Sequence, residues 1–225
     1  MNDLVAFWAL CRKEWATERR SHQNVLGALL YGLVIAAIFA FTLSPRPEVV
    51  HNVFPGMLWV GISFAALLLL SRCFAGDREN DATALLLSAP IDRSTIYYAK
   101  VFVYFGYLVL LEVIMVPVFL AFFGQRVQGN LLLFCAILAL GTLGLVSIGV
   151  LAAALAEGLR GAEILFPLLV LPLAVPDLLA AVQVTAGVVA AASWNEYALW
   201  LELLGLYDVL FLAVPGLLFE YVMEG

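Results

Sequence analysis

Residues 72–100 read RCFAGDRENDATALLLSAPIDRSTIYYAK and form the only long polar stretch in the first half of the chain. On both sides lie charge-poor apolar runs that are long enough to cross a bilayer, which takes about 20 residues of helix. A polar stretch between two such runs predicts two membrane spans joined by a loop. The fold is therefore expected to be an all-α integral membrane bundle.

The middle of this loop is predicted to be a short docking helix. Ala82–Ser88 consists of helix-forming residues, and Pro90 ends the segment because proline cannot continue a helix. Asp92 or Ser94 can cap the next helix, since their side-chain oxygens accept a bond from free backbone N–H groups. A bare linker does not need the three leucines at 85–87, so we expect them to press on a partner. The alternative is an amphipathic helix on the membrane surface.

Composition places the whole chain in the membrane. Of 225 residues, 64% are hydrophobic and 12% are charged, and the mean hydropathy is +1.04. Soluble domains carry about 25% charged residues and do not bury this much apolar surface. A nucleic-acid partner is not expected, because the 11 lysines and arginines form no continuous basic face.

Six membrane spans are expected in a single transmembrane domain over residues 1–225. In chain order they cover 25–43, 53–71, 96–123, 131–156, a kinked span that starts at 164, and 197–221. The fourth span carries small residues that allow close contact between helices: Gly141, Gly144, Ser147 and Gly149.

The apolar run over residues 164–194 is too long for one straight span. Its 31 residues would measure about 46 Å as a straight helix, half as long again as the bilayer core. Pro167, Pro172 and Pro176 also interrupt it. We therefore predict a kinked fifth span, followed by a re-entrant segment over 178–194 and then by the last span.

Residues 1–24 are expected to contain a helix lying in the membrane interface. Its apolar residues recur at helical spacing: Leu4, Trp8, Cys11 and Trp15. Its charged residues cover the other faces, and the basic side chains among them are expected to lie in water: Arg12, Lys13, Glu14, Glu18, Arg19 and Arg20. A soluble helix packed on a partner is the alternative.

The basic residues predict the orientation of the bundle. With six spans, lysine and arginine fall on one side at positions 12, 13, 19, 20, 72, 78, 93, 100 and 160. Arg46 and Arg126 fall on the other side. By the positive-inside rule, both termini, the loop over 72–95 and a short charged turn over 157–163 are cytoplasmic.

Neither a catalytic nor a metal-binding motif is found in the sequence. The two histidines, His22 and His51, fall on opposite sides of the membrane, and neither lysine follows a glycine as a phosphate-binding loop requires. If the protein works with ATP, another chain is expected to bind it. His51 is a candidate haem ligand through its imidazole, with a solvated loop histidine as the ordinary alternative.

Four acidic residues lie within the predicted apolar segments: Glu112, Asp177, Glu202 and Asp208. An ionisable group at that depth is expensive and by default marks a function. A protonated or paired carboxyl inside the bundle is the structural alternative. The sequence does not say which of the four face each other.

The polar loop resembles the first cytoplasmic loop of ABC-2-type transporter permeases. The resemblance rests on an acidic-rich turn, a short helix ending in Leu-Leu-Leu-Ser-x-Pro, and a basic residue about ten positions later that opens an apolar helix. In that family the short helix is the coupling helix, which sits in a cleft of a separate ATPase subunit. The coupling residues implied here are Asp77, Arg78, Glu79, Asp81, Leu85, Leu86, Leu87, Ser88 and Pro90, with Glu157 and Arg160 in the second turn.

Along nearly the whole chain, the order of elements resembles the CcmB branch, the membrane subunit of the cytochrome c maturation system. The most specific matches are Phe-Pro-Gly-Met-Leu-Trp-Val at 54–60 and Leu-Phe-Pro-Leu-Leu-Val-Leu-Pro-Leu-x-x-Pro at 165–176. Arg12-Lys13-Glu14 and residues 77–100 also match, whereas residues 186–225 match loosely.

This resemblance implies a non-catalytic permease subunit of a type-2 ABC exporter-like complex in a bacterial inner membrane. The implied partners are a CcmA-like ATPase subunit that binds ATP, a second copy of this chain, a CcmC-like haem-handling subunit, a small CcmD-like subunit and a CcmE-like haem chaperone. Haem is the implied cargo, and no cofactor is expected to bind directly. ATP hydrolysis would drive either haem export or release of the haem-loaded chaperone. A permease for a lipid, polysaccharide or drug, and a membrane scaffold without an ATPase, stay open as alternatives.

Overall fold

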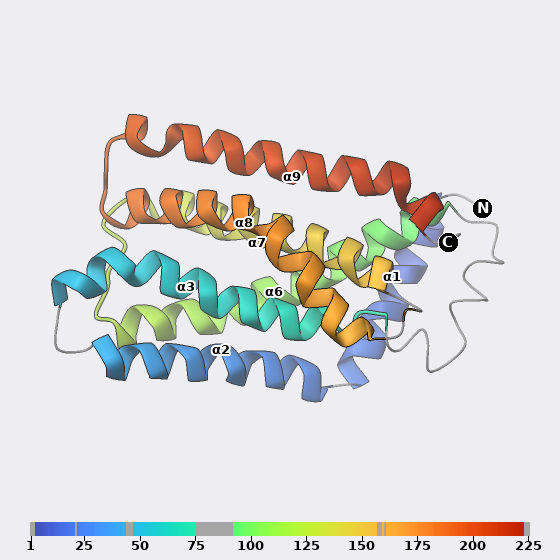
Figure 1. Ribbon diagram of the computed structural model, residues 1–225, viewed down its shortest axis with the longest axis horizontal. Coiled ribbons are helices and arrows are strands. Elements are labelled where there is room, and N and C mark those ends of the chain that lie inside the picture. Colours follow the sequence, from blue (N-terminus) through green and yellow to red (C-terminus); the bar gives the residue numbers. More distant parts are fainter. Residues whose placement is uncertain are drawn as a thin grey trace.

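The computed structural model describes residues 3–20, 22–43, 47–74, 92–156, 159 and 161–222, and every regular element in these ranges is an α-helix (Figure 1). Labelled as in Figure 1, the helices are α1 (Asp3–Arg20), α2 (His22–Leu43), α3 (Pro47–Leu70), α6 (Arg93–Phe122), α7 (Leu131–Ala156), α8 (Ala162–Val189) and α9 (Trp194–Val222). All of these except α1 contain a segment long and apolar enough to cross a membrane. The prediction of an all-α, multi-pass membrane protein with six spans is confirmed.

Local sequence signals set several helix boundaries. The helix α7 begins and ends at the predicted residues, Leu131 and Ala156. Asp92 caps α6, because its side chain accepts a bond of 2.9 Å from the backbone N–H of Ser94. The helix α3 begins at Pro47, ahead of the predicted span, since proline suits a first helical turn in which its missing N–H is not needed.

The helix α8 corrects the prediction for the proline-rich run. It is one helix of 28 residues that bends in its middle (Figure 1), and residues 178–189 continue it instead of forming a re-entrant segment. Prolines are tolerated in membrane helices where neighbours satisfy the backbone groups that a bend exposes. Here Tyr207 of α9 donates a 2.6 Å bond to the carbonyl of Leu173. The chain turns only after Val189, at Ala191, whose φ is 52°.

The helix α7 occupies the centre of the bundle, where it packs against α3, α6, α8 and α9. Its small residues make this possible, as predicted. A Cβ added at Gly141 would come within 2.4 Å of the Trp59 ring of α3, and one at Gly149 within 2.5 Å of Leu70. The missing side chains therefore let α3 approach the backbone of α7 closely.

A tyrosine ties the start of α6 to the end of α9. Pro215 has no backbone N–H, so the carbonyl of Phe211, four residues earlier, lacks its helical donor. The hydroxyl of Tyr97 donates to that carbonyl at 2.6 Å. This bond replaces the one that the proline removes, and it joins two helices that are far apart in the sequence.

The helix α1 runs across one end of the bundle, at a steep angle to the other helices and at the end where α9 finishes (Figure 1). It packs on the first half of α6, where the Trp15 and Tyr107 rings stack 4.8 Å apart. Its Leu4, Trp8 and Trp15 side chains are exposed on the protein surface. This placement suits the predicted interfacial helix, which would lay those side chains in the headgroup region.

Candidate functional site

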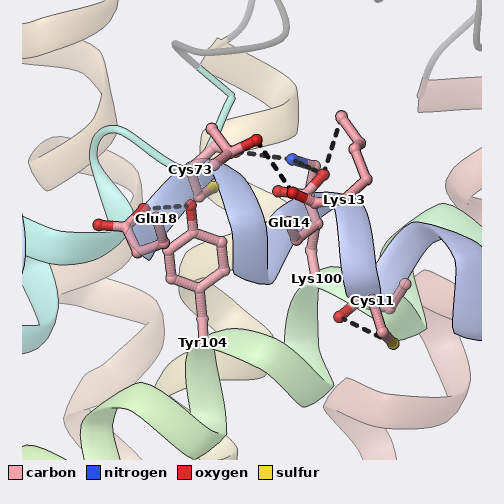
Figure 2. Close-up of polar contacts among 9 residues, drawn as sticks. Cys11, Lys13, Glu14, Glu18, Cys73, Lys100 and Tyr104 are labelled. Atoms are coloured by element: carbon pink, nitrogen blue, oxygen red, sulfur yellow. Dashed lines mark hydrogen bonds and ion pairs between the residues drawn. The ribbon is translucent and has the colours of Figure 1, made fainter. Parts of the chain in front are cut away.

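The base of the polar loop is held by a buried lysine. Lys100 lies in the third turn of α6 with no exposed surface. Its Nζ lies 3.0 Å from Oε1 of Glu14 in α1 and donates a 2.6 Å bond to the carbonyl of Cys73, just beyond α3 (Figure 2). One side chain thus connects three helices. We call Glu14, Lys100 and the Cys73 carbonyl the Lys100 junction.

The buried Lys100 ammonium is surrounded by groups that compensate its charge. A lysine ammonium without water must be paired, because an isolated buried charge is very costly. Lys100 has a carboxylate and a carbonyl as acceptors, and its Nζ also lies 4.3 Å from the centroid of the Phe74 ring. Glu14 also pairs with Lys13 at 3.0 Å, but the Lys13 side chain is 33% exposed. The two lysines therefore hold the same carboxylate in very different surroundings.

A second acidic residue of α1 lies beside the junction. Glu18 is buried, and its Oε2 accepts a 3.3 Å bond from the hydroxyl of Tyr104 in α6 (Figure 2). Burial raises the pKa of the Glu18 carboxyl, and the bond from Tyr104 opposes that shift. Glu14 and Glu18, which the sequence pattern places on the charged faces of α1, are both buried. The side of α1 that carries them packs against α6, and the indole rings of Trp8 and Trp15 lie on its exposed surface instead.

The junction lies directly at the two ends of the predicted docking segment. Phe74 and Asp92 are the described residues nearest to it on either side; Cys73 directly precedes Phe74, and Lys100 follows Asp92 by two turns. The predicted docking residues from Asp77 to Pro90 lie outside the described residues, as do Glu157 and Arg160 of the second turn. Their role stays a prediction.

The structure brings together two of the four intramembrane acids. Asp177 of α8 and Asp208 of α9 are both buried and face the same point of α7, Gly144. Glu112 of α6 is also buried, but its carboxylate accepts a bond from Thr142 of α7 and is not part of that pair. Glu202 of α9 is exposed.

His51, the candidate haem ligand, lies at the opposite end of the bundle. His51 of α3 has its Nδ1 2.9 Å from Oε1 of Gln125, which follows α6. A cavity of about 400 Å³ lies nearby, lined by Ala40, Val50, Ala121, Phe122, Phe123, Gly124 and Gln125. The imidazole of His51 thus joins two segments at this end of the bundle, and whether it ligates haem stays a prediction.

Sequence reasoning missed the Lys100 junction because its members are far apart in the chain. One signal was available: Glu14 and Glu18 are four residues apart, so both lie on one face of α1. A lysine two turns inside an apolar helix was the second signal. Neither of these two signals indicates that Glu14 and Lys100 are in contact.

Comparison with known proteins gives one consistent result. A model of the family described as CcmB protein matches residues 5–220. "Heme exporter protein B" of Rhodobacter capsulatus is 34% identical over 151 residues, which cover 67% of this chain and 69% of that protein. The protein of the same name from Pseudomonas aeruginosa is 29% identical over 71% of each chain. That from Haemophilus influenzae is 29% identical over 89% of each.

Proposed function

This chain belongs to the CcmB family, and we propose that it is the membrane subunit of a haem export complex that is driven by a separate ATPase subunit. The ATPase docks on the loop over 72–95, and the Lys100 junction carries its movement into the membrane. The complex lies in a bacterial inner membrane with both termini in the cytoplasm. Its further partners are a second copy of this chain, a CcmC-like subunit, a CcmD-like subunit and a CcmE-like chaperone.

The observation that carries the proposal is the position of Lys100. The lysine ties the exit of α3 to the entry of α6, so the two stems of the docking loop are joined through buried contacts. Glu14 adds α1 to the same contact. A pull on the loop would therefore shift α1, α3 and α6 together, since closely packed elements move as units and do not deform continuously.

The names of the relatives support haem as the cargo, because each is called heme exporter protein B. Work by this subunit would end either in haem crossing the membrane or in release of a haem-loaded chaperone. In both cases the ATP is hydrolysed elsewhere, and this chain transmits force.

Co-purification from native membranes tests the proposal. The wild-type chain is compared with Leu85→Asp/Leu86→Asp and with Gln128→Asp, which adds one negative charge at an exposed position on the other end of the bundle. We expect the ATPase subunit with the wild type and with Gln128→Asp, and its loss from the double variant. Haem-handling proteins among the other co-purified chains would support the cargo. Absence of an ATPase from all three preparations would overturn the proposal.

A further inference from the structure

Two carboxyl groups meet inside the membrane-spanning part of the bundle. Asp177 of α8 has no exposed surface, and Asp208 of α9 is 3% exposed. A Cβ built on Gly144 of α7 would lie 2.4 Å from Oδ1 of Asp177 and 2.6 Å from Oδ1 of Asp208. Because both oxygens lie this close to one point, they cannot be more than 5.0 Å apart. Gly144 leaves open the space that both carboxyls face.

Within the described ranges of the chain, these carboxyls have no hydrogen-bond partner. All four oxygens of Asp177 and Asp208 are buried there and accept no bond. An ionised carboxylate in such surroundings is very costly, and two of them side by side repel each other as well. No lysine, arginine or histidine forms an ion pair with either residue within the part of the chain that the structure describes. The two carboxyls therefore need a positive charge that none of the described residues supplies.

The surrounding polar groups are already engaged. Tyr207, the neighbour of Asp208 on α9, donates its proton to the carbonyl of Leu173. From α7, the Ser147 hydroxyl donates to the carbonyl of Leu143 at 2.7 Å. From α3, which packs on α8, the indole of Trp59 donates to Thr185 at 2.9 Å. None of these groups is directed at the two carboxyls.

The titratable groups of α6 are engaged elsewhere. The Tyr97 hydroxyl donates to the carbonyl of Phe211 at 2.6 Å and lies 3.2 Å from the carbonyl of Ser147. Glu112 is bonded to Thr142, which stands two residues before Gly144 and so points about 200° away around α7. The two aspartates therefore form a site of their own.

We propose that Asp177 and Asp208 form an intramembrane proton-binding site, in which the two carboxyls share one proton taken from water and returned to it. One carboxyl donates an O–H and the other accepts it, so a single proton removes one charge and satisfies two oxygens. A metal ion suits the site less well, because hard cations take six or more oxygen ligands. Within the described residues no group of three or more histidine, cysteine, aspartate or glutamate side chains gathers to hold a metal. Proton binding at this site does not require the ATPase.

Proton occupancy of this site would control the packing of two spans. With the proton bound, α8 and α9 are held together by the shared bond beside Gly144. Loss of the proton leaves two like charges in a dry contact, which drives the helices apart or draws water in.

Infrared difference spectroscopy of the purified full chain tests the proposal directly. A pH titration of the wild type is compared with Asp177→Asn/Asp208→Asn, and Glu112→Gln and Glu202→Gln serve as controls for the other two acids. We expect a band from one protonated carboxylic acid that persists at neutral pH in the wild type and in both controls and is missing from the double variant. A spectrum in which the double variant keeps that band would overturn the site.

Labelling of the wild type alone gives an independent reading, should the double variant fail to fold. An apolar carbodiimide reacts with protonated carboxyls, and peptide mass spectrometry locates the product. We expect modification of Asp177 or Asp208, at most one per chain, that decreases as the pH is raised. If neither residue is modified, the proton site is contradicted. It is also contradicted if sodium chloride, but not choline chloride, protects the two aspartates from modification at constant pH, because that result would indicate a bound cation instead.

Discussion

At the scale of single residues, the Lys100 junction shows how a buried charge is paired. Lys100 and Glu14 are both buried and 3.0 Å apart. Removing one member of a buried ion pair strongly lowers the free energy of unfolding, because the other member then remains charged in a site without water. The Glu14 carboxylate also pairs with the partly exposed Lys13, so the buried and the exposed ion pair of one carboxylate can be compared.

We predict that Lys100→Met lowers the free energy of unfolding by about 3–5 kcal/mol. Lys13→Met, the matched control, should lower it by about 0–1 kcal/mol, since a partly exposed pair is screened by water. Chemical unfolding in mixed micelles, followed by circular dichroism, measures both. If the two variants lose the same free energy of unfolding, burial of the Lys100 pair adds nothing to the stability of the protein.

The stability of the protein should depend on pH through Glu18. Burial raises the pKa of this carboxyl above its ordinary value of 4.5. A raised folded-state pKa means that the favourable contribution is complete below that ordinary value and is lost as the pH rises through the folded-state pKa. The variant Glu18→Gln keeps an oxygen acceptor for Tyr104 but does not ionise. We predict that the melting temperature of Glu18→Gln gains on that of the wild type as the pH rises from 4.5.

The control for this experiment is Glu163→Gln, which changes an exposed carboxyl in the first turn of α8. If Glu18→Gln behaves in the same way as this control, burial of Glu18 does not influence stability.

At the scale of secondary-structure elements, α7 shows how small residues set helix contacts. The rigid ring of Trp59 occupies the space beside Gly141, whereas nothing lies within 4 Å of a Cβ added at Gly205 in α9. The two glycines therefore have different roles, although both stand inside apolar helices.

We predict that Gly141→Ala lowers the free energy of unfolding by about 1–3 kcal/mol, because the new methyl group overpacks the contact with α3. Gly205→Ala should be neutral or stabilising by up to about 1 kcal/mol, since alanine favours helix. Melting temperatures of the two variants measure the difference. A stabilised Gly141→Ala would mean that α3 and α7 have room to separate.

At the scale of the whole molecule, the proposed roles of the Lys100 junction and of the docking loop can be tested separately. Under the proposed function, replacement of leucines 85 and 86 would remove the contact with the ATPase, whereas replacement of Lys100 would leave that contact and remove its connection to the helices. We predict that Lys100→Met still co-purifies with the ATPase but supports at least about ten-fold less cytochrome c maturation in cells, a loss equivalent to about 1.4 kcal/mol.

Lys13→Met is the control here too and should retain maturation close to that of the wild type. The readout is the amount of haem-containing cytochrome c, normalised to the amount of membrane-inserted variant. Loss of the ATPase from Lys100→Met would instead make the junction part of the docking surface.

The sequence by itself determined the features that depend on neighbouring residues. Apolar runs about 20 residues long specify spans wherever they occur, so the six spans and the bounds of α7 were predictable. The cap at Asp92 and the small residues of α7 were predictable for the same reason. Only the tertiary structure decided which polar groups meet. Asp177 and Asp208 are paired while Glu202 is exposed, and Lys100 binds a glutamate 86 residues away. Such pairs are set by the rotation of each helix against its neighbours, and that rotation depends on the packing of the whole bundle.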